Sequence, residues 1–309
     1  MATGPIRHGN KIVTPEIITN KIMLHKLKVL KALKGNAIRQ TRKLFRIKSR
    51  PKAPVLNMPV EKILERHSMI CRRLADFWAA DLNLQGASVC EIGPGDCLAA
   101  AAFFVAKGAS HVDLVELQPP VLNEKQFRIL STLKEAGMPI SLDIVRAENS
   151  GFALNPERIT YYKDQMENYQ VKSQHGLVFS HHVLEHVEDL NVMFEAAYHA
   201  LRPGGRMLHV VDLGGHSEFE DPIPPLDFQT YPDWLFEAMY PTHHRNTRRF
   251  LADYKSAAAR AGFKQIEIHP TRSAEKNYLT AIHGRLRVAA RRQPMEDLAV
   301  IEFNLTAIK

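Results

Sequence analysis

The feature that most constrains this chain is a short apolar strand that runs directly into a glycine turn and then into a helix. The strand covers residues 88–92, the turn reads Gly93-Pro94-Gly95, and an alanine-rich helical segment follows at 96–107. Glycine suits such a turn because it adopts positive φ at little cost and lets a ligand lie close to the backbone. A strand, a glycine turn and a helix in this order predict one unit of a parallel sheet.

From residue 60 onward the chain repeats this alternation of helical and strand patterns. The alternation predicts an α/β fold, Rossmann-like, with a seven-stranded, mostly parallel sheet and helices on both faces. The expected strands are 88–92, 111–116, 159–162, 177–180, 206–212, 265–269 and 298–307, and the expected helices are 61–82, 96–107, 123–136, 190–201 and 249–261.

An acidic residue follows the turn at the spacing found in nucleoside-binding folds. Glu116 ends the second strand 21 residues after Gly95, and an interval of about 20 residues lets a carboxylate reach ribose hydroxyls. NAD fits less well, because its fingerprint needs a third glycine where this chain has Leu98, and Asp96 at the helix start would repel a pyrophosphate. S-adenosylmethionine has a ribose and a cationic amino-acid part but no phosphate, and Glu91 can lie near its positive charge.

Four segments, in order, resemble class I S-adenosylmethionine-dependent methyltransferases, in particular the bacterial small-molecule group of types 11 and 23. Residues 89–95 (VCEIGPG) resemble motif I, and residues 112–116 (VDLVE) resemble the acidic strand after it. Residues 177–187 (LVFSHHVLEHV) resemble the fourth strand and its following turn, and residues 201–206 (LRPGGR) the turn before the fifth strand. The resemblance spans about residues 85–270 and departs at Cys97, where the family often has a third glycine.

The resemblance implies a cofactor site at the carboxyl ends of the first strands. Gly93 and Gly95 would approach the methionine part, Glu116 would bind the ribose hydroxyls, and Asp164 would meet the adenine amino group. Asp164 is otherwise a surface loop aspartate. The predicted cofactor-binding residues are Glu91, Gly93, Pro94, Gly95, Glu116, Leu117, Asp164, Gln165 and Ser180.

Two histidines are the predicted catalytic residues. Methyl transfer asks little of side chains, because the sulfonium is an activated leaving group and positioning supplies much of the rate. A base is needed only when the acceptor must lose a proton. His181 at the end of the fourth strand and His216 just after the fifth are the candidates, since imidazole exchanges protons near neutral pH. Each is otherwise a hydrogen-bonded loop residue.

A different chemistry is suggested by residues 182–186, which spell the HxxEH pattern of inverted zinc metallopeptidases. A zinc hydrolase would need a long helix through this run and a further ligand downstream. The preceding residues 177–180 favour a strand instead, so no metal ligands are assigned. The zinc hydrolase, and a minor divalent-ion site on His182, Glu185 and His186, stay as alternatives.

The acceptor is predicted to be a small molecule, or a sugar or lipid-linked compound. The fourth strand ends in Ser-His-His and lacks the Asn/Asp-Pro-Pro-aromatic string that holds flipped base amino groups. Residues 214–247 form the predicted acceptor-binding lid, because their aromatic and proline side chains can wall an apolar pocket. A helical cap that only packs on the sheet is the alternative for this segment. An RNA-directed methyltransferase and a catalytically silent binding module are the alternatives for the whole chain.

Residues 1–60 form a predicted basic, partly helical extension ahead of a methyltransferase domain at 61–309. The extension holds 14 Lys and Arg against the single acid Glu16, a net charge of +13, whereas the remaining residues carry −5. Apolar residues recur at helical spacing over 16–34 with lysines between them. Residues 16–52 therefore predict attachment to an anionic membrane surface or to nucleic acid. The alternative is a solvated helix that packs on the domain.

The composition also bears on location. The longest apolar run, residues 98–106, is nine residues, whereas a membrane-spanning helix needs about 20. Cys71, Cys90 and Cys97 form no CxxC pair, which argues against a disulfide scaffold or a structural zinc site. We therefore expect a cytoplasmic protein without a transmembrane segment, whose membrane contact, where it exists, is peripheral.

Overall fold

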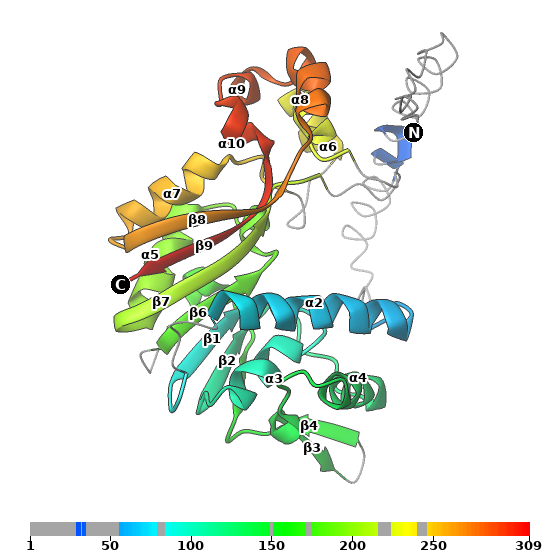
Figure 1. Ribbon diagram of the computed structural model, residues 1–309, viewed down its shortest axis with the longest axis vertical. Coiled ribbons are helices and arrows are strands. Elements are labelled where there is room, and N and C mark those ends of the chain that lie inside the picture. Colours follow the sequence, from blue (N-terminus) through cyan, green and yellow to red (C-terminus); the bar gives the residue numbers. More distant parts are fainter. Residues whose placement is uncertain are drawn as a thin grey trace, which may run out of the picture.

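The computed structural model describes residues 29–31, 33–34, 56–78, 84–148, 151–170, 175–215, 224–239 and 246–309. They form a seven-stranded sheet in the order β5-β2-β1-β6-β7-β9-β8, with helices on both faces (Figure 1). The predicted Rossmann-like α/β fold is confirmed. The strands are β1 (Ser88–Ile92), β2 (His111–Val115), β5 (Ile159–Tyr162), β6 (His175–His181), β7 (Leu201–Asp212), β8 (Lys264–Ser273) and β9 (Val300–Ile308).

The strand order places a topological switch point between β1 and β6. Strands β5, β2, β1, β6 and β7 pair in parallel, and β9 runs antiparallel between β7 and β8. The chain proceeds outward from β1 through β2 to β5 and then returns to the other side of β1 with β6. In open α/β sheets, ligands bind outside the carboxyl ends of the strands at such a reversal.

Side chains alternate between two hydrophobic cores because successive strand residues point to opposite faces of a sheet. Val89, Leu177 and Phe179 pack on one face, under α2 (Val60–Trp78), α3 (Ala99–Ala106) and α4 (Glu124–Glu135). Cys90 and Val178 pack on the other, under α5 (Leu190–Ala200) and α7 (Leu251–Arg260). The sheet is therefore the middle of three layers.

A helical cap beyond the sheet was only partly predicted. One part is η4 (Asp227–Thr230) with α6 (Asp233–Met239), which follows β7 and falls in the predicted lid. The other part joins β8 to β9 and had no counterpart in the sequence prediction, nor had a hairpin of β3 (Val145–Glu148) and β4 (Gly151–Leu154). The second part consists of α8 (Lys276–Ile282), η5 (His283–Arg285), α9 (Val288–Arg291) and α10 (Met295–Ala299).

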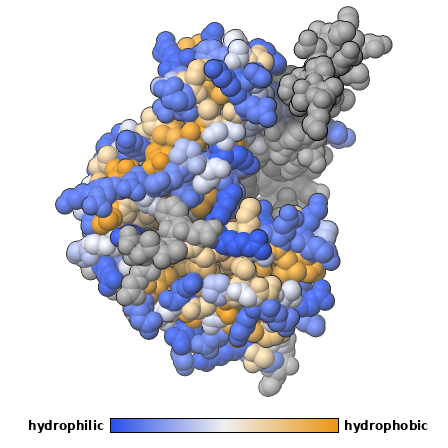
Figure 2. Space-filling model, in the orientation of Figure 1, coloured by the Kyte–Doolittle hydropathy of each residue, from blue (hydrophilic) through white to orange (hydrophobic). Residues whose placement is uncertain are grey.

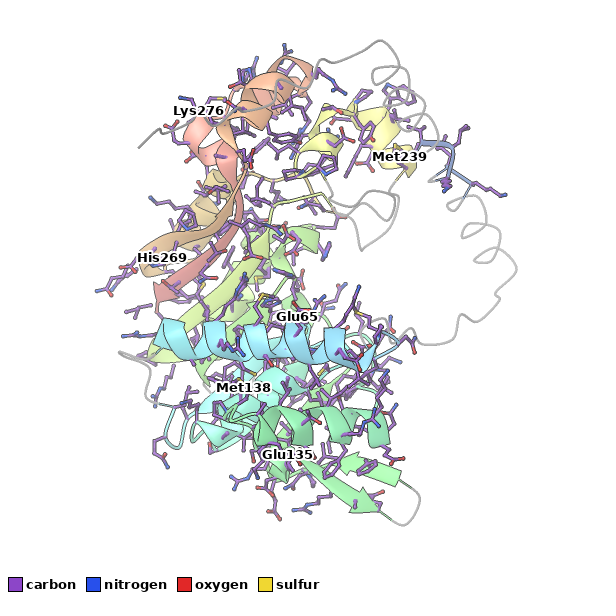
Figure 3. All side chains as sticks on the ribbon, turned by 45° about the vertical axis from the view of Figure 1, so that its right-hand side comes forward. Glu65, Glu135, Met138, Met239, His269 and Lys276 are labelled. Carbon is purple, nitrogen blue, oxygen red and sulfur yellow. The ribbon has the colours of Figure 1, made fainter. Side chains whose placement is uncertain are left out.

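The described part of the basic extension contacts this cap. Residues 29–31 and 33–34 are helical, and Val29 packs against the cap cluster of Phe228, Tyr231, Phe236 and Met239. Met239 lies beside the segment in Figure 3. The other residues of the extension lie outside the described chain. The boundary at residue 60 and the acceptor role of the lid stay predictions.

The surface in Figure 2 is mostly hydrophilic, with smaller hydrophobic patches between the polar residues. Within the described residues, no helix is both long enough and apolar enough to cross a bilayer. Cys71, Cys90 and Cys97 are buried free thiols.

Candidate active site at the carboxyl ends of the strands

A cavity of about 570 Å³ lies at the carboxyl ends of β1, β2 and β6, where the strand order reverses. Its size falls within the range of about 300–1,000 Å³ that is usual for small-molecule sites. The predicted site residues that line it are Glu91, Gly93, Pro94, Gly95, Glu116, Leu117, Asp164, Gln165 and His181. Residues from two strands and three loops, up to 90 positions apart in sequence, therefore meet around one space.

The glycine turn forms the floor of the cavity. Gly93 and Gly95 have φ of 65° and 66°, a region that side chains other than glycine rarely adopt. The amide of Gly93 donates to the carbonyl of Val115 at 2.9 Å, which joins the turn to the end of β2. A Cβ atom at position 93 would lie only 2.6 Å from Cγ2 of Val183. Glycine is thus required at position 93 for two reasons: the backbone has a positive φ, and Val183 leaves no room for a Cβ atom.

Glu91 is a buried acid beneath the turn. Its side chain is 4% exposed, and Oε2 has no hydrogen-bond partner within the described chain. Burial raises the pKa of this carboxyl to about 8. A cationic group in the cavity would supply the missing partner and favour the ionised form. The amino-acid part of S-adenosylmethionine carries such a group, so this residue fits that ligand.

Two further carboxylates stand at the ends of β2 and β5. The backbone amide of Gln118 donates to Oε1 of Glu116 at 3.3 Å, and the Tyr161 hydroxyl donates to the Glu116 carbonyl at 2.9 Å. Oδ1 of Asp164 accepts from the Gln165 amide at 2.8 Å and from Asn168 Nδ2 at 3.1 Å. These bonds orient two acceptors along the cavity, where ribose hydroxyls and an adenine amino group could donate to them.

Histidines line the cavity wall at the end of β6. His181 is half-buried, and its Nε2 is enclosed without a hydrogen-bond partner in the described chain. Burial, then the neighbouring His182 and Arg66, hold the pKa of His181 well below its ordinary value. The rings of His181 and His182 lie 4.0 Å apart between centroids, and Nε2 of His182 lies 3.1 Å from Oε2 of Glu302. His181 is therefore an uncharged imidazole at neutral pH.

One predicted site residue, Ser180, lies away from the cavity. Ser180 points to the opposite face of β6 from Phe179 and His181, because neighbouring strand residues alternate. Its Oγ is hydrogen-bonded to Nδ1 of His209 at 2.8 Å in the core, so Ser180 does not line the cavity. His216 lies outside the described residues.

The HxxEH run does not form the helix that a zinc hydrolase requires. His182 follows the end of β6, and only the short η3 (Leu184–His186) comes after it. Glu185 is fully buried, burial raises the pKa of its carboxyl well above the ordinary value, and its backbone carbonyl accepts from Thr247. In the part of the chain described, no three His, Cys, Asp or Glu side chains are grouped to hold a metal ion.

Sequence reasoning missed a second wall of the cavity, which α2 supplies. Arg66, His67 and Ile70 line it from this helix. Burial, then the charge of Arg66, lowers the pKa of His67 to about 4. The sequence predicted a helix over residues 61–82 but not what this helix covers. His67 within that helix was the only residue that could have pointed to a site, and a single histidine does not distinguish a site from a core position.

The doubly wound sheet, the glycine turn and the acidic strand ends at the switch point define the fold of a class I S-adenosylmethionine-dependent methyltransferase. The sequence matches the family model described as a methyltransferase domain over residues 64–268, which is most of the chain. The chain therefore belongs to this methyltransferase family, whose methyl donor is S-adenosylmethionine.

The fold resembles solved structures only at a distance. One is phosphoethanolamine N-methyltransferase 2 of Haemonchus contortus bound to S-adenosylmethionine, with 17% identity, a TM-score of 0.46, and coverage of 79% of this chain and 52% of that one. The chain thus spans about half of that enzyme's length. Another is an S-adenosylmethionine-dependent methyltransferase of Mesorhizobium loti, with 15% identity, a TM-score of 0.43, and coverage of 77% and 97%. No curated protein sequence matches the chain.

Proposed function

We propose that this chain is an active methyltransferase that methylates a small-molecule acceptor, such as a phenol, an amine, or a sugar or lipid-linked compound. The observation that carries the proposal is that one cavity joins the predicted cofactor residues to an imidazole-lined wall. A methyl donor held on the first side would therefore face an acceptor held on the second.

The cofactor side supplies the groups that S-adenosylmethionine needs. Glu91 would pair with the cationic amino-acid part over Gly93 and Gly95, Glu116 would accept hydrogen bonds from the ribose, and Asp164 from the adenine. Bound there, this cofactor supplies an activated methyl group. Helix α2 lines the cavity through Ile70 and His67, and these side chains would help to orient an acceptor in line with the methyl group.

The alternatives have less support. A catalytically silent binding module has no need for uncharged imidazoles beside the cofactor site, which His67 and His181 provide. An RNA-directed enzyme would stack bases on aromatic side chains, and Phe179 is the only aromatic residue besides histidine among the described residues that line the cavity. We therefore place the small-molecule acceptor first.

Calorimetric titration tests the cofactor site. We expect S-adenosylmethionine and S-adenosylhomocysteine to bind and NAD not to bind. Glu116→Ala should weaken binding of both adenosyl ligands about 10- to 100-fold, since hydrogen bonds to a charged group contribute about 1.5–3 kcal/mol. Glu135→Ala, on the outer helix α4, is the matched control (Figure 3). An unchanged affinity in Glu116→Ala would contradict the assignment.

Methyl transfer itself is tested with tritiated S-adenosylmethionine and a panel of phenols, alcohols, amines and single-stranded RNA. Label in a small-molecule product supports the proposal. Tight cofactor binding without transfer to any acceptor would favour the silent module, and label in RNA would favour the RNA-directed enzyme. Failure of the wild type to bind either adenosyl ligand would overturn the proposal altogether.

A further inference from the structure

A carboxylate and an imidazole from distant strands meet at the cavity wall. Glu302 is near the start of β9, and His182 lies 120 residues earlier in the chain, directly after β6. The distance from Oε2 of Glu302 to Nε2 of His182 is 3.1 Å. Oε1 of Glu302 accepts from Arg73 Nη1 at 2.7 Å and from Thr271 Oγ1 at 2.7 Å. The Glu302 side chain is 4% exposed. Three groups from α2, β6 and β8 therefore fix one buried carboxylate.

This network determines which nitrogen of His182 carries the proton. Burial alone would raise the pKa of Glu302, but the hydrogen bonds from His182 and Thr271 and the charge of Arg73 lower it to about 2. The carboxylate is therefore ionised at neutral pH and has no proton to donate. The hydrogen of the His182–Glu302 bond must then be on Nε2. In the neutral ring, Nδ1 is left with a lone pair that can accept a proton.

The backbone at His182 is held in an uncommon conformation. Its φ is 55°, in the left-handed region that residues with a side chain seldom occupy. The His182 amide donates to the Val210 carbonyl at 2.8 Å, and the ring lies against that of His181. Backbone strain of about 1–3 kcal/mol is typically retained where it positions a functional group. Here it places the His182 ring both against Glu302 and in the cavity wall.

We propose that His182 is the general base of methyl transfer and that Glu302 is the residue that positions it, an inference that rests on the proposed function. Nδ1 of His182 accepts the proton that the acceptor O–H or N–H group loses. The acceptor atom keeps the electron pair of that bond for its new bond to the methyl carbon, and the sulfur keeps the pair of the C–S bond that breaks. Glu302 stabilises the resulting imidazolium, which then releases its proton to water.

His181, the base candidate named from sequence, is less suited to this role. No carboxylate is bonded to it in the described chain, and burial and nearby positive charge oppose its protonation. Among the described residues, the charged and titratable groups near this pair are Glu302 itself from β9, Arg73 from α2, His181 at the end of β6, and Glu185 from η3, whose carboxyl interacts with that of Glu302. Glu302 is the one bonded to the ring.

The tautomer can be measured without any acceptor, by ¹⁵N NMR of histidine-labelled protein saturated with S-adenosylhomocysteine. His182→Gln assigns the His182 signals by their loss. We expect the neutral His182 ring of the wild type to carry its proton on Nε2 and none on Nδ1. Glu302→Gln should remove this preference, since an amide can either donate or accept. A proton on Nδ1 in the wild type would overturn the proposal, and this measurement can equally be made without ligand if the cofactor assignment fails.

Kinetics test the catalytic part, with the acceptor that supports wild-type turnover in the panel of phenols, alcohols and amines. His182→Gln should lower kcat about 10²- to 10⁴-fold, the usual contribution of a general base, while affinity for S-adenosylhomocysteine changes less than about threefold. Glu302→Gln should lower kcat less and move the acid limb of the pH–rate profile to lower pH, because loss of the carboxylate charge disfavours the imidazolium. Glu302→Asp should restore part of the rate.

The chain offers a matched control pair at the outer edge of the sheet. Nε2 of His269, which is labelled in Figure 3, lies 3.1 Å from Oε2 of Glu267 on β8. The separation is the same as in the buried pair, but both side chains are exposed. His269→Gln and Glu267→Gln should leave rate, pH profile and affinity unchanged. Full activity in His182→Gln, or a loss of S-adenosylhomocysteine affinity equal to the loss of rate, would overturn the assignment of His182 as base.

Discussion

Gly93 has a positive φ, and Val183 occupies the space that a Cβ atom at this position would need. Experiments can separate these two constraints. Gly137 also has a positive φ, of 82°, but a Cβ there would meet nothing within 4 Å. We expect Gly137→Ala to lose about 1–2 kcal/mol of unfolding free energy from backbone strain alone. Gly93→Ala should lose more, and should also weaken S-adenosylmethionine binding at least tenfold, because Val183 must shift. Denaturant unfolding and calorimetry measure both, and equal losses in the two variants would show that the contact with Val183 is unimportant.

Glu91 links the stability of the protein to pH. Its pKa is raised from 4.5 to about 8 on folding, so its contribution is fully present below about pH 4.5 and is lost as the pH rises toward 8. At pH 7, Glu91→Gln should therefore be more stable than the wild type by about 1–3 kcal/mol, at about 1.4 kcal/mol per pH unit. The difference should shrink toward pH 5, and the variant should bind S-adenosylmethionine more weakly. Thermal unfolding across pH checks the sign, and a wild type that is the more stable at pH 7 would contradict it.

Local patterns allowed some of these residues to be named from sequence, and distant contacts prevented others. Glu91, Gly93 and Glu116 stand at strand ends next to a recognisable turn, so their place in the site follows from chain order. Ser180 was misplaced because a shift of one residue along a strand changes the face of the sheet. Glu302 could not be found, because its role depends on a register between β7 and β9 that brings it close to His182 across 120 residues.

Among the elements, the buried strands were the most predictable, because parallel strands covered on both faces read as short apolar runs. All seven strands of the sheet were expected near their observed places. The strand expected at 298–307 begins at Val300, since Leu298 belongs to α10 and packs with the cap. Helices α8, α9 and α10 were not expected, since helices of four to seven residues carry too few turns for a periodic pattern.

Arg287 joins the two parts of the cap by hydrogen bonds. Its substitution therefore tests whether the cap helices form one unit. Its Nε donates to Gln229 Oε1 at 2.7 Å and its Nη2 to the Arg248 carbonyl at 2.7 Å. Arg287→Ala should destabilise the cap by about 2–3 kcal/mol, because it leaves the partly buried acceptors without donors. Amide hydrogen exchange should accelerate in η4, α6 and α8 to α10 and stay unchanged in β1, β2 and β6. Arg285→Ala, an exposed neighbour, is the control, and a uniform acceleration in the whole chain would show that the cap is not a separate unit.

At the scale of the whole molecule, the charge is divided between a basic extension and an acidic domain. We propose that the extension attaches the protein to an anionic membrane surface, since lysines and apolar residues alternate along 16–34. The contact at Val29 would hold the lipid-facing segment beside the predicted acceptor lid. A lipid-linked acceptor could then reach the enzyme at the membrane surface.

Vesicle flotation tests this attachment. The protein should float with phosphatidylserine vesicles, float less at high salt, and not float with neutral vesicles. Lys31→Glu with Lys34→Glu should weaken binding by at least tenfold, since each lysine near such a surface contributes about 1 kcal/mol. Lys264→Glu with Lys276→Glu, on the sheet edge and the cap, is the control. Salt-dependent binding to single-stranded RNA without binding to vesicles would contradict the proposal and show that the anionic partner of the extension is nucleic acid.

The position of β9 between β7 and β8 has a consequence for synthesis on the ribosome. Strand β8 is made first, yet among the described strands it pairs only with β9, which follows at Val300. At about 5–20 residues per second, β8 waits on the order of seconds before its neighbour emerges. During that time an unpaired strand edge is open to other nascent chains. Because Glu302 arrives on the same strand, the hydrogen bond that holds His182 in the cavity wall forms when this exposed edge is covered.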